Sequence, residues 1–412
     1  MRNTTPFARF ALGFACALAF CVEAAAATTF DDLVREAFAR SQTPWEPPTP
    51  EPVAELDPPE GDGSLGLDFV EYGKLGGQNF FDDGVWWLRP SPRGNFEKDR
   101  LALWTYRPAR EDYTPVGYRE TGFNYRHRAI NPPLPKPIPA AARYLSAVDV
   151  GFRQTDPDGW PQILHLGGNG YGRLSGFPPL GFGTSFRLGV RNVGRVTEDF
   201  VKLRELYLMQ LNERTFRLLG LVEGEAYAAA FTATLQPGEA STLRVAMTLF
   251  PRLPLRVARE PSVGPLGLSS MFWKDESATP KHADDEAHDA DLFVAWDPSG
   301  AQRRQPLAIP ASPEDPPLIT DFGAATDFAL VQSDRKPGHY RQYASADYAN
   351  RSSLLISDIQ SSLPYTVVLW QSYTSYEGAD NVAVFVRFNQ DADPPTSVEG
   401  GITFSYTLTA YR

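Results

Sequence analysis

Residues 269–273, Ser-Ser-Met-Phe-Trp, and the loop that follows them combine the residue types that a carbohydrate site needs. The aromatic rings of Phe272 and Trp273 could stack on the apolar faces of sugar rings. The loop ends in the run HDAD (288–291), and paired carboxylates can bind sugar hydroxyls or transfer protons when a glycosidic bond is cleaved. The same residues also fit a structural interpretation, in which a half-buried strand leads into a solvated acidic loop.

A metal-binding module is the alternative from a different functional class. Its ligands would come from one stretch of acidic residues and histidines: His282, Asp284, Asp285, Glu286, His288, Asp289 and Asp291. Clustered carboxylate oxygens suit calcium, and two histidines could suit zinc. Their spacing, however, matches neither the helical zinc motif nor the calcium-binding loop. We therefore expect no metal site and no cofactor.

Four ordered segments of the sequence resemble the periplasmic glucan biosynthesis family, the OpgG/OpgD (MdoG) proteins. The run LSSMFWKDE (268–276) is similar to the family's S-M-F-W-x-x-E, and EAHDAD (286–291) is similar to its E-x-H-D-S-D. FALVQSDR (328–335) with the HY that follows is similar to F-G-L-L-Q-R-D-R and H-Y, and EGADN (377–381) to E-T-N-D-N. The resemblance extends over nearly all of the chain after its first residues, but it covers only the large N-terminal domain of the family.

The resemblance implies an all-β fold, a twisted antiparallel β-supersandwich like that of galactose mutarotase, with an open cleft on one face. It also implies an inverting endo-β-1,2-glucanase, or a transglycosylase, that acts on osmoregulated periplasmic glucans. Such enzymes use one carboxylic acid and one carboxylate. By their positions in the motifs, Asp380 corresponds to the general acid and Asp289 to the general base. The implied partner is a β-glucan, and glucan-synthesis machinery at the inner membrane is a further candidate partner.

The resemblance also indicates residues that would bind the glucan beside the two catalytic carboxylates. They are Glu377, His288, Asp291, Trp273, Phe272, Ser270 and Tyr340. Because a general acid must be protonated near neutral pH, we expect Asp380 to be partly desolvated or to lie beside another carboxylate, with Glu377 as the candidate. We expect Asp289 to be kept ionised by His288 or by a nearby donor. Without the resemblance, the residues around Asp380 would be interpreted as a turn between two strands.

The sequence departs from the family pattern near both acids. Leu292 replaces a glycine, and GAQRRQPL (300–307) stands where the family has a tryptophan-rich strand. RSSLLISD (351–358) lacks the tryptophan and the glutamate of the corresponding motif, and Gly378 and Ala379 replace a threonine and an asparagine. The two acids are retained while the stacking residues differ. A non-catalytic glucan-binding factor in periplasmic glucan assembly is therefore the alternative function.

Residues 1–26 have the features of a secretory signal peptide. Arg2 and Arg9 give a basic start, and the apolar stretch that leads to a small-residue cleavage site is too short to span a bilayer. Both cysteines of the chain, Cys16 and Cys21, lie in this segment, so the exported chain would contain no disulfide. We expect a periplasmic protein without a membrane span. A net charge of −11 without a basic stripe argues against nucleic acid as a partner.

The chain after the signal peptide is expected to form one domain. Thr29 can cap an amphipathic helix that runs to about Arg40, and a proline-rich stretch follows it. Residues 27–60 are therefore expected to form a helix and an arm packed on the domain. Residues 61–412 are expected to form the β-supersandwich, with no C-terminal immunoglobulin-like domain.

Alternating apolar residues predict the strands. Residues 227–235 and 243–249 predict a hairpin, and Pro237-Gly238 suits a type II turn. Residues 198–212 fit a helix as well as a strand, and we expect a strand because the similar segment of the family is one. The run GGNGYG (167–172) lacks the strand-to-helix context of a dinucleotide site, and we interpret it as turns. His127 and His165 are interpreted as ordinary strand residues.

Overall fold

The structure is a computed structural model of the 412-residue chain. The described residues are 28–47, 51–54, 56, 77–94, 97–128, 130, 134, 136–152, 162–176, 181–191, 199–255, 263–273, 287–340, 348–373 and 380–412. The predicted signal peptide, most of the predicted proline-rich arm, residues 274–286 of the acidic loop and Glu377 lie outside the described residues.

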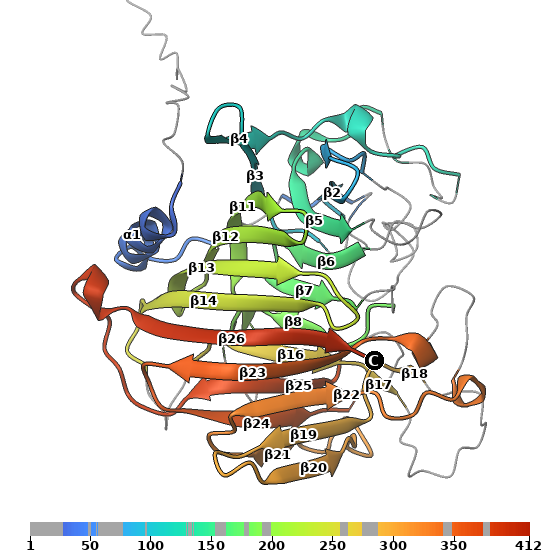
Figure 1. The fold of residues 1–412 in the computed structure, drawn as a ribbon, viewed down its shortest axis with the longest axis vertical. Coiled ribbons are helices and arrows are strands. Elements are labelled where there is room, and N and C mark those ends of the chain that lie inside the picture. The colour runs from blue at the N-terminus through green and yellow to red at the C-terminus, as the bar shows by residue number, and fades with distance from the viewer. Residues whose placement is uncertain are drawn as a thin grey trace, which may run out of the picture.

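Two large β-sheets make up most of the described chain (Figure 1). The ten-stranded sheet has the order β1 (Phe81–Asp82), β2 (Trp86–Pro92), β5 (Leu145–Phe152), β6 (Gln162–Gly167), β7 (Tyr171–Leu174), β8 (Ser185–Arg187), β16 (Leu266–Ser270), β25 (Val382–Phe388), β24 (Tyr365–Gln371) and β21 (Leu318–Asp321). The eleven-stranded sheet has the order β20 (Gln302–Pro306), β19 (Leu292–Trp296), β22 (Asp327–Val331), β23 (Ser353–Ser361), β26 (Ile402–Tyr411), β14 (Thr242–Pro251), β13 (Tyr227–Gln236), β12 (Thr215–Glu223), β11 (Lys202–Asn212), β3 (Ala102–Arg107) and β4 (Asp112–Val116). Among the described strands of the two sheets, only β3 and β11 pair in parallel.

Smaller elements connect or flank these sheets. A three-stranded sheet contains β10 (Asp199–Phe200), β9 (Val190–Arg191) and β15 (Val263–Gly264). A two-stranded sheet contains β17 (Phe272–Trp273) and β18 (Ala287–His288). The described residues also form short 3₁₀ helices: η1 (Glu120–Gly122), η2 (Ala140–Ala142), η3 (Pro337–His339), η4 (Tyr348–Asn350) and η5 (Val398–Gly400). Within the described residues, no helix is both long and apolar enough to cross a membrane.

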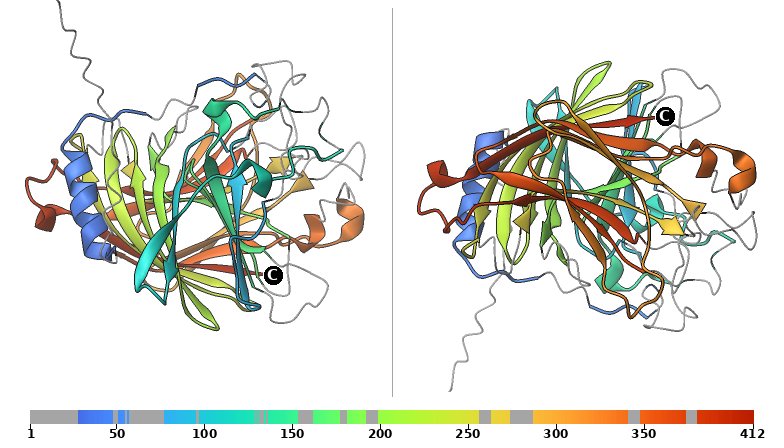
Figure 2. Two further views of the ribbon diagram at one scale, coloured as in Figure 1. Left: turned by 90° about the horizontal axis from the view of Figure 1, so that it is seen from above. Right: turned by 90° about the horizontal axis from the view of Figure 1, so that it is seen from below.

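The two large sheets form two layers around one apolar core (Figures 1 and 2). Strands of both sheets contribute every second residue to this core, as the period-two pattern predicts. Examples are Val382, Val384 and Val386 of β25, and Leu243, Val245, Met247 and Leu249 of β14. Each such fully buried aliphatic side chain stabilises the fold by about 1.5–3 kcal/mol. The predicted all-β sandwich is confirmed.

The predicted hairpin is present, but its turn differs from the predicted one. Strands β13 and β14 pair in register from Tyr227 opposite Pro251 to Gln236 opposite Thr242. A type II turn centred on Pro-Gly would require a positive φ at Gly238, and this residue is not among the described glycines with positive φ. Instead, the hydroxyl of Ser241 accepts from the Gly238 amide and donates to its carbonyl, both at 3.2 Å. The type II prediction was therefore wrong.

Two other local predictions are confirmed. The described part of the segment 198–212 forms β10 and β11, and β11 pairs with β12 on one side and β3 on the other. The glycine-rich run at 167–172 forms the turn between β6 and β7. Gly170 in this turn has a φ of 77°, a left-handed conformation that favours glycine.

Helix α1 (Phe30–Ser41) packs on the outer face of the eleven-stranded sheet (Figure 1). Thr29 caps it as predicted: its hydroxyl accepts from the Asp32 amide at 3.2 Å, and its own amide donates to the Asp32 carboxylate at 2.9 Å. The buried residues Leu33 and Ala37 pack with residues of β12, β13 and β14. The predicted helix and its cap are confirmed.

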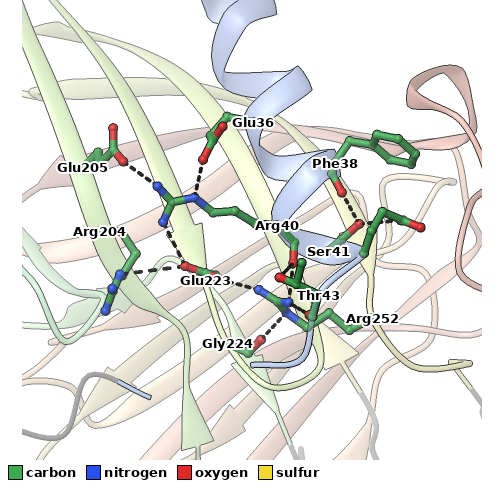
Figure 3. Close-up of polar contacts among 11 residues, drawn as sticks. Glu36, Phe38, Arg40, Ser41, Thr43, Arg204, Glu205, Glu223, Gly224 and Arg252 are labelled. Carbon is green, nitrogen blue, oxygen red and sulfur yellow. Dashed lines mark hydrogen bonds and ion pairs between the residues drawn. The ribbon is translucent and has the colours of Figure 1, made fainter. Parts of the chain in front are cut away.

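A charged network joins the C-terminal end of α1 to the same sheet (Figure 3). Arg40 lies 2.7 Å from the Glu205 carboxylate and 3.1 Å from the Glu223 carboxylate, and its Nε donates to Glu36 at 2.7 Å. Glu223 also pairs with Arg252, which directly follows β14. Because one arginine of the helix engages two strands, β11 and β12, the helix has a fixed position on the sheet.

Candidate functional site

One face of the ten-stranded sheet carries a row of polar side chains. Strand register places them side by side, one per strand: Arg89 (β2), Asp149 (β5), His165 (β6), Arg173 (β7), Ser185 (β8) and Ser269 (β16). We refer to these six residues as the polar row. Their strand neighbours, such as Leu164 and Leu268, belong to the core between the sheets. Because successive side chains of a strand point to opposite faces, the polar row faces away from that core.

Asp380, the predicted general acid, lies at the β16 end of the polar row, just before β25. Its Oδ2 accepts a hydrogen bond from the hydroxyl of Ser269 at 2.6 Å and from Nη2 of Arg187 at 3.2 Å. The Arg187 guanidinium lies 4.0 Å from the centre of the Tyr171 ring, and that ring's hydroxyl bonds with Ser185. The Asp380 side chain is 22% exposed. The neighbour of this carboxylate is therefore a cation, whereas the expected neighbour Glu377 lies outside the described residues.

Asp289, the predicted general base, directly follows β18. Its amide donates to the carbonyl of Met271 at 3.0 Å, which fixes it beside the β16–β17 connection. Its carboxylate is 4% exposed and pairs with Arg351. The Arg351 guanidinium in turn lies 4.0 Å from the centre of the Tyr348 ring. The donor beside Asp289 is thus an arginine rather than His288.

Asp289 and Asp380 are both hydrogen-bonded to one short segment, residues 269–272. The Asp380 carboxylate accepts from the Ser269 hydroxyl, and the Asp289 backbone amide donates to the Met271 carbonyl. Burial lowers the pKa of Arg173, but the Tyr171 hydroxyl, which accepts a hydrogen bond from Arg173, and the negative charges of Asp289 and Asp380 outweigh burial and raise this pKa above its ordinary value. Although 91 positions separate Asp289 and Asp380 in the sequence, both stabilise the charged form of Arg173, one half-buried arginine of the polar row.

Asn381, next to Asp380, fixes the position of this segment. Its side-chain oxygen accepts from the Phe272 amide at 2.8 Å, and its side-chain nitrogen donates to the Phe272 carbonyl at 2.9 Å. Its own amide donates to the Ser270 carbonyl at 3.2 Å. Asn381 is buried, so these hydrogen bonds hold Asp380 at a defined place relative to β16 and β17.

Several residues predicted to bind glucan are packed inside the protein. Phe272 is 1% exposed, Ser270 and His288 are fully buried, and Tyr340 is 4% exposed. The His288 ring lies 5.9 Å from the Phe272 ring and 4.8 Å from the Tyr340 ring, measured between centroids. These side chains therefore support the segment that carries Asp289, and their rings present no open face for stacking in this structure.

Asp291 and Trp273 complete the set of predicted residues. The Asp291 carboxylate accepts from the Ser333 amide at 2.9 Å, from its hydroxyl at 2.7 Å and from the Asp334 amide at 2.8 Å. Asp291 thus anchors the loop that follows β22. Trp273 lies on β17, opposite Ala287, and its side chain is outside the described part of the structure.

The structure also shows functional candidates that sequence reasoning missed, above all Arg173, Arg187 and Arg351. The signal for the first two was present as polar residues at every second position, YGRL in β7 and SFR in β8. His127 was predicted to lie on a strand, and this was wrong: its amide donates to the Asn124 carbonyl at 3.1 Å within a turn.

His165 lies on β6 as predicted, but it is part of a buried charged cluster. Its Nδ1 is 2.8 Å from the Asp149 carboxylate and its Nε2 is 3.2 Å from the Glu97 carboxylate. Asp149 also pairs with Arg89 at 3.2 Å and accepts from Gln162. Burial lowers the pKa of His165, but the hydrogen bonds and charges of its two carboxylates outweigh this effect and raise the pKa to about 9. Burial raises the pKa of Glu97.

This cluster predicts that the protein loses stability in mildly alkaline solution. The pKa of His165 is raised above its ordinary value of 6.5, so its contribution to stability is fully present below about pH 6.5 and is lost as the pH rises through about 9. We expect the free energy of unfolding to fall by about 2 kcal/mol between about pH 7 and 9.5. Urea denaturation across this range measures it. His165→Gln should remove most of the decline, and an equal decline in that variant would contradict the assignment.

Among the described residues, no group of three or more histidine, cysteine, aspartate or glutamate side chains is arranged to hold a metal ion. In the alternative metal module, the His288 ring packs against Tyr340, Asp289 pairs with Arg351, and Asp291 accepts from the Ser333 amide. His282, Asp284, Asp285 and Glu286 lie outside the described residues.

Two solved structures are similar to this chain at low scores. A galactose mutarotase related enzyme from Lactobacillus acidophilus is 10% identical with a TM-score of 0.26, over 66% of this chain and 92% of that chain. A putative aldose 1-epimerase from Escherichia coli K12 is 9% identical with a TM-score of 0.22, over 50% and 68%. The fold assignment rests on the two sheets of this structure and not on these scores.

Sequence comparison gives the family. Glucans biosynthesis protein G of Vibrio cholerae serotype O1 is 25% identical over 284 residues, which cover 67% of this chain and 49% of the relative. The same-named protein of Rhodopseudomonas palustris is 27% identical over 190 residues, covering 46% and 36%. The chain spans about half the length of the first of these relatives. The family model described as periplasmic glucan biosynthesis protein, MdoG, matches residues 29–412. With this match the predicted resemblance is confirmed, and the chain belongs to the MdoG family of periplasmic glucan biosynthesis proteins.

Proposed function

We propose that this protein is an inverting endo-β-1,2-glucanase or transglycosylase that acts on osmoregulated periplasmic glucans. The observation that carries the proposal is that Asp289 and Asp380, from distant parts of the chain, are both hydrogen-bonded to the segment 269–272. The charges of both also raise the pKa of Arg173. Sugar hydroxyls are bound well by such alternating carboxylates and guanidinium groups, because each charged group can accept or donate several hydrogen bonds.

In the proposed reaction, Asp380 gives its proton to the glycosidic oxygen as the bond from that oxygen to the anomeric carbon breaks. A water molecule attacks the anomeric carbon from the opposite face, and Asp289 takes the proton that this water loses, directly or through a substrate hydroxyl. The products are two shorter glucans, one with a new reducing end of inverted configuration. In transglycosylation, a sugar hydroxyl replaces the water.

The ion pair between Asp380 and Arg187 places a specific requirement on this reaction. A carboxyl oxygen that accepts hydrogen bonds from a guanidinium and a hydroxyl cannot at the same time present a proton to the glycosidic oxygen. The proposal therefore requires that bound glucan separates Arg187 from Asp380, with sugar hydroxyls taking over hydrogen bonds of the pair. The hydroxyl of Ser269 can remain as a donor to Asp380 during this exchange.

An Arg187→Gln variant tests this requirement. Because glutamine leaves no ion pair for glucan to break, we expect hydrolysis to be retained or to become faster. The measurement is kcat/KM with linear β-1,2-glucan. Arg387→Gln is the matched control, since Arg387 pairs with Asp321 at 3.4 Å on the same sheet but outside the polar row. A fall of kcat/KM by more than about tenfold in Arg187→Gln, with Arg387→Gln unaffected, would contradict the requirement that glucan separates the pair.

The second candidate function is a non-catalytic glucan-binding factor in periplasmic glucan assembly. The specific observation in its favour is that each of the two carboxylates has an arginine partner, Arg187 or Arg351, as charged groups in a binding site commonly do. Incubation of the protein with linear β-1,2-glucan, followed by detection of new reducing ends, separates the two functions. Glucan cleavage supports the enzyme. Binding of glucan without cleavage, for β-1,2 and for several other linkages, supports the binding factor.

A further inference from the structure

A cavity lies against the eleven-stranded sheet, where it is lined by residues of β3 and β11. It has a volume of about 600 Å³ and lies between the end of α1, the β2–β3 loop, strand β11 and η2. None of the residues that line it belongs to the polar row or contacts Asp289 or Asp380. Small-molecule sites of proteins have volumes of about 300–1,000 Å³, so the cavity has room for a molecule of one or two rings.

Part of the charge around this cavity is already compensated. Arg40 pairs with Glu205 and Glu223, as Figure 3 shows, and Tyr207 donates a hydrogen bond to Glu205 at 2.8 Å. Arg252 supplies a second cation to Glu223. This side of the cavity is therefore close to neutral, and it serves to fix α1 on the sheet.

Three cations of the cavity wall, Lys98, Arg100 and Arg204, are not compensated in this way. Within the described structure, Lys98 and Arg100 have no ion pair with a carboxylate, and the remaining acid of the wall is Glu51. Arg204 approaches Glu223 only to 3.8 Å, and its side chain is 27% exposed. Its charge is therefore only partly compensated, and the guanidinium remains suited to an oxyanion in the cavity.

The wall that presents two of these cations is held in place. The Tyr144 hydroxyl donates to the Lys98 carbonyl at 2.6 Å, and the Asp99 carboxylate pairs with Lys202 at 3.0 Å. The Arg100 guanidinium lies 5.0 Å from the centre of the Tyr144 ring. Because the backbone at Lys98 and the side chain of Asp99 are both held, the backbone from which Lys98 and Arg100 extend has a defined position before a ligand binds, which reduces the entropy cost of binding.

We propose that this cavity binds a small anionic molecule through an oxyanion group, a phosphate or a carboxylate, held by Lys98, Arg100 and Arg204. Guanidinium groups form charge-assisted, often bidentate hydrogen bonds with such oxyanions, and an ammonium group adds a further donor. Ala102, Ala140 and Ala141 provide the apolar part of the wall for the rest of the ligand. This site is separate from the proposed glucan-cleaving site and does not depend on it.

Calorimetric titration of the purified protein with glucose 6-phosphate, inorganic phosphate, glucuronate and glucose tests the proposal. We expect binding of the three anions and not of glucose, because the oxyanion is the recognised group. The difference in affinity between glucose 6-phosphate and inorganic phosphate measures the contribution of the sugar ring. The affinity for glucuronate shows whether the site binds a carboxylate as well as a phosphate. Affinity should fall as the salt concentration rises, since the cations are partly exposed.

Two variants assign the binding to this cavity. Arg204→Gln and, separately, Lys98→Gln should each weaken anion binding at least about tenfold. Arg244→Gln on β14 is the matched control, because Arg244 is exposed on the same sheet and does not line the cavity. Asp380→Asn should leave anion binding unchanged, so the result is independent of the glucan-cleaving activity.

The proposal is overturned if none of the three anions binds at concentrations up to about 10 mM, where even an affinity of about −4 kcal/mol is detected. It is also overturned if Arg204→Gln and Lys98→Gln, both shown to be folded by circular dichroism, bind as tightly as the unaltered protein. Equal binding of glucose and glucose 6-phosphate would likewise contradict recognition of an oxyanion.

Discussion

Asp380→Asn is expected to lower the hydrolysis of linear β-1,2-glucan by about 10³-fold while glucan binding is retained. Asparagine has the size of aspartate and keeps an oxygen that can accept from Ser269 and Arg187, but it has no proton to give to the leaving oxygen. The rate is measured from new reducing ends, and binding is measured by calorimetry with the same glucan.

Asp321→Asn is the control for this experiment. Asp321 also pairs with an arginine on the ten-stranded sheet, Arg387, but it lies at the edge strand β21, outside the polar row. Its variant should cleave glucan at the unaltered rate. Undiminished cleavage by Asp380→Asn would exclude Asp380 as the general acid. Loss of binding together with cleavage would assign Asp380 to glucan binding instead.

Arg351→Met is expected to destabilise the protein by about 3 kcal/mol, because it leaves the carboxylate of Asp289 buried without its paired cation. The methionine side chain fills much of the same space beside Tyr348, so the decrease in the free energy of unfolding is due mainly to the missing positive charge. Urea denaturation monitored by tryptophan fluorescence measures the free energy of unfolding.

The double variant Asp289→Asn/Arg351→Met isolates the charge effect. Since the buried negative charge is absent, it should recover about half or more of the stability that the single variant loses. Arg244→Met, at an exposed position of β14, should change stability by less than about 0.5 kcal/mol. If the double variant is no more stable than Arg351→Met, the pair with Asp289 is not the reason for the loss.

Much of the fold follows from the sequence because its signals are local. Alternation of apolar residues is sufficient to predict inner strands such as β14 and β25, and Thr29 with Asp32 three positions later predicts the start of α1. The hairpin loop was less predictable. Pro237-Gly238 suits a type II turn in isolation, but Ser241 forms hydrogen bonds with Gly238 and gives a longer loop.

The candidate site was predictable only in part, because strand register assembles it. Nothing close to Arg173 or Arg187 in the sequence connects them to Asp380. They come together because β7, β8 and β16 are neighbours in the sheet. The burial of Phe272 and His288 also could not be read from residue type, since an aromatic residue next to hydroxyls suits a cleft as well as a core. All five residues of β16 are buried, so this part of the sheet is covered on both faces.

The position of β26 in the eleven-stranded sheet has a consequence for how the chain can fold. This strand pairs with β14 on one side and with β23 on the other, so residues 402–411 join two parts of the sheet. The chain is synthesised from its N-terminus. Until residues 402–411 have been made, β14 and β23 both have an unpaired edge. Residues 30–41 likewise need strands that are made about two hundred positions later. The eleven-stranded sheet therefore cannot be completed until residues 402–411 have been synthesised, and its two parts stay unjoined until then.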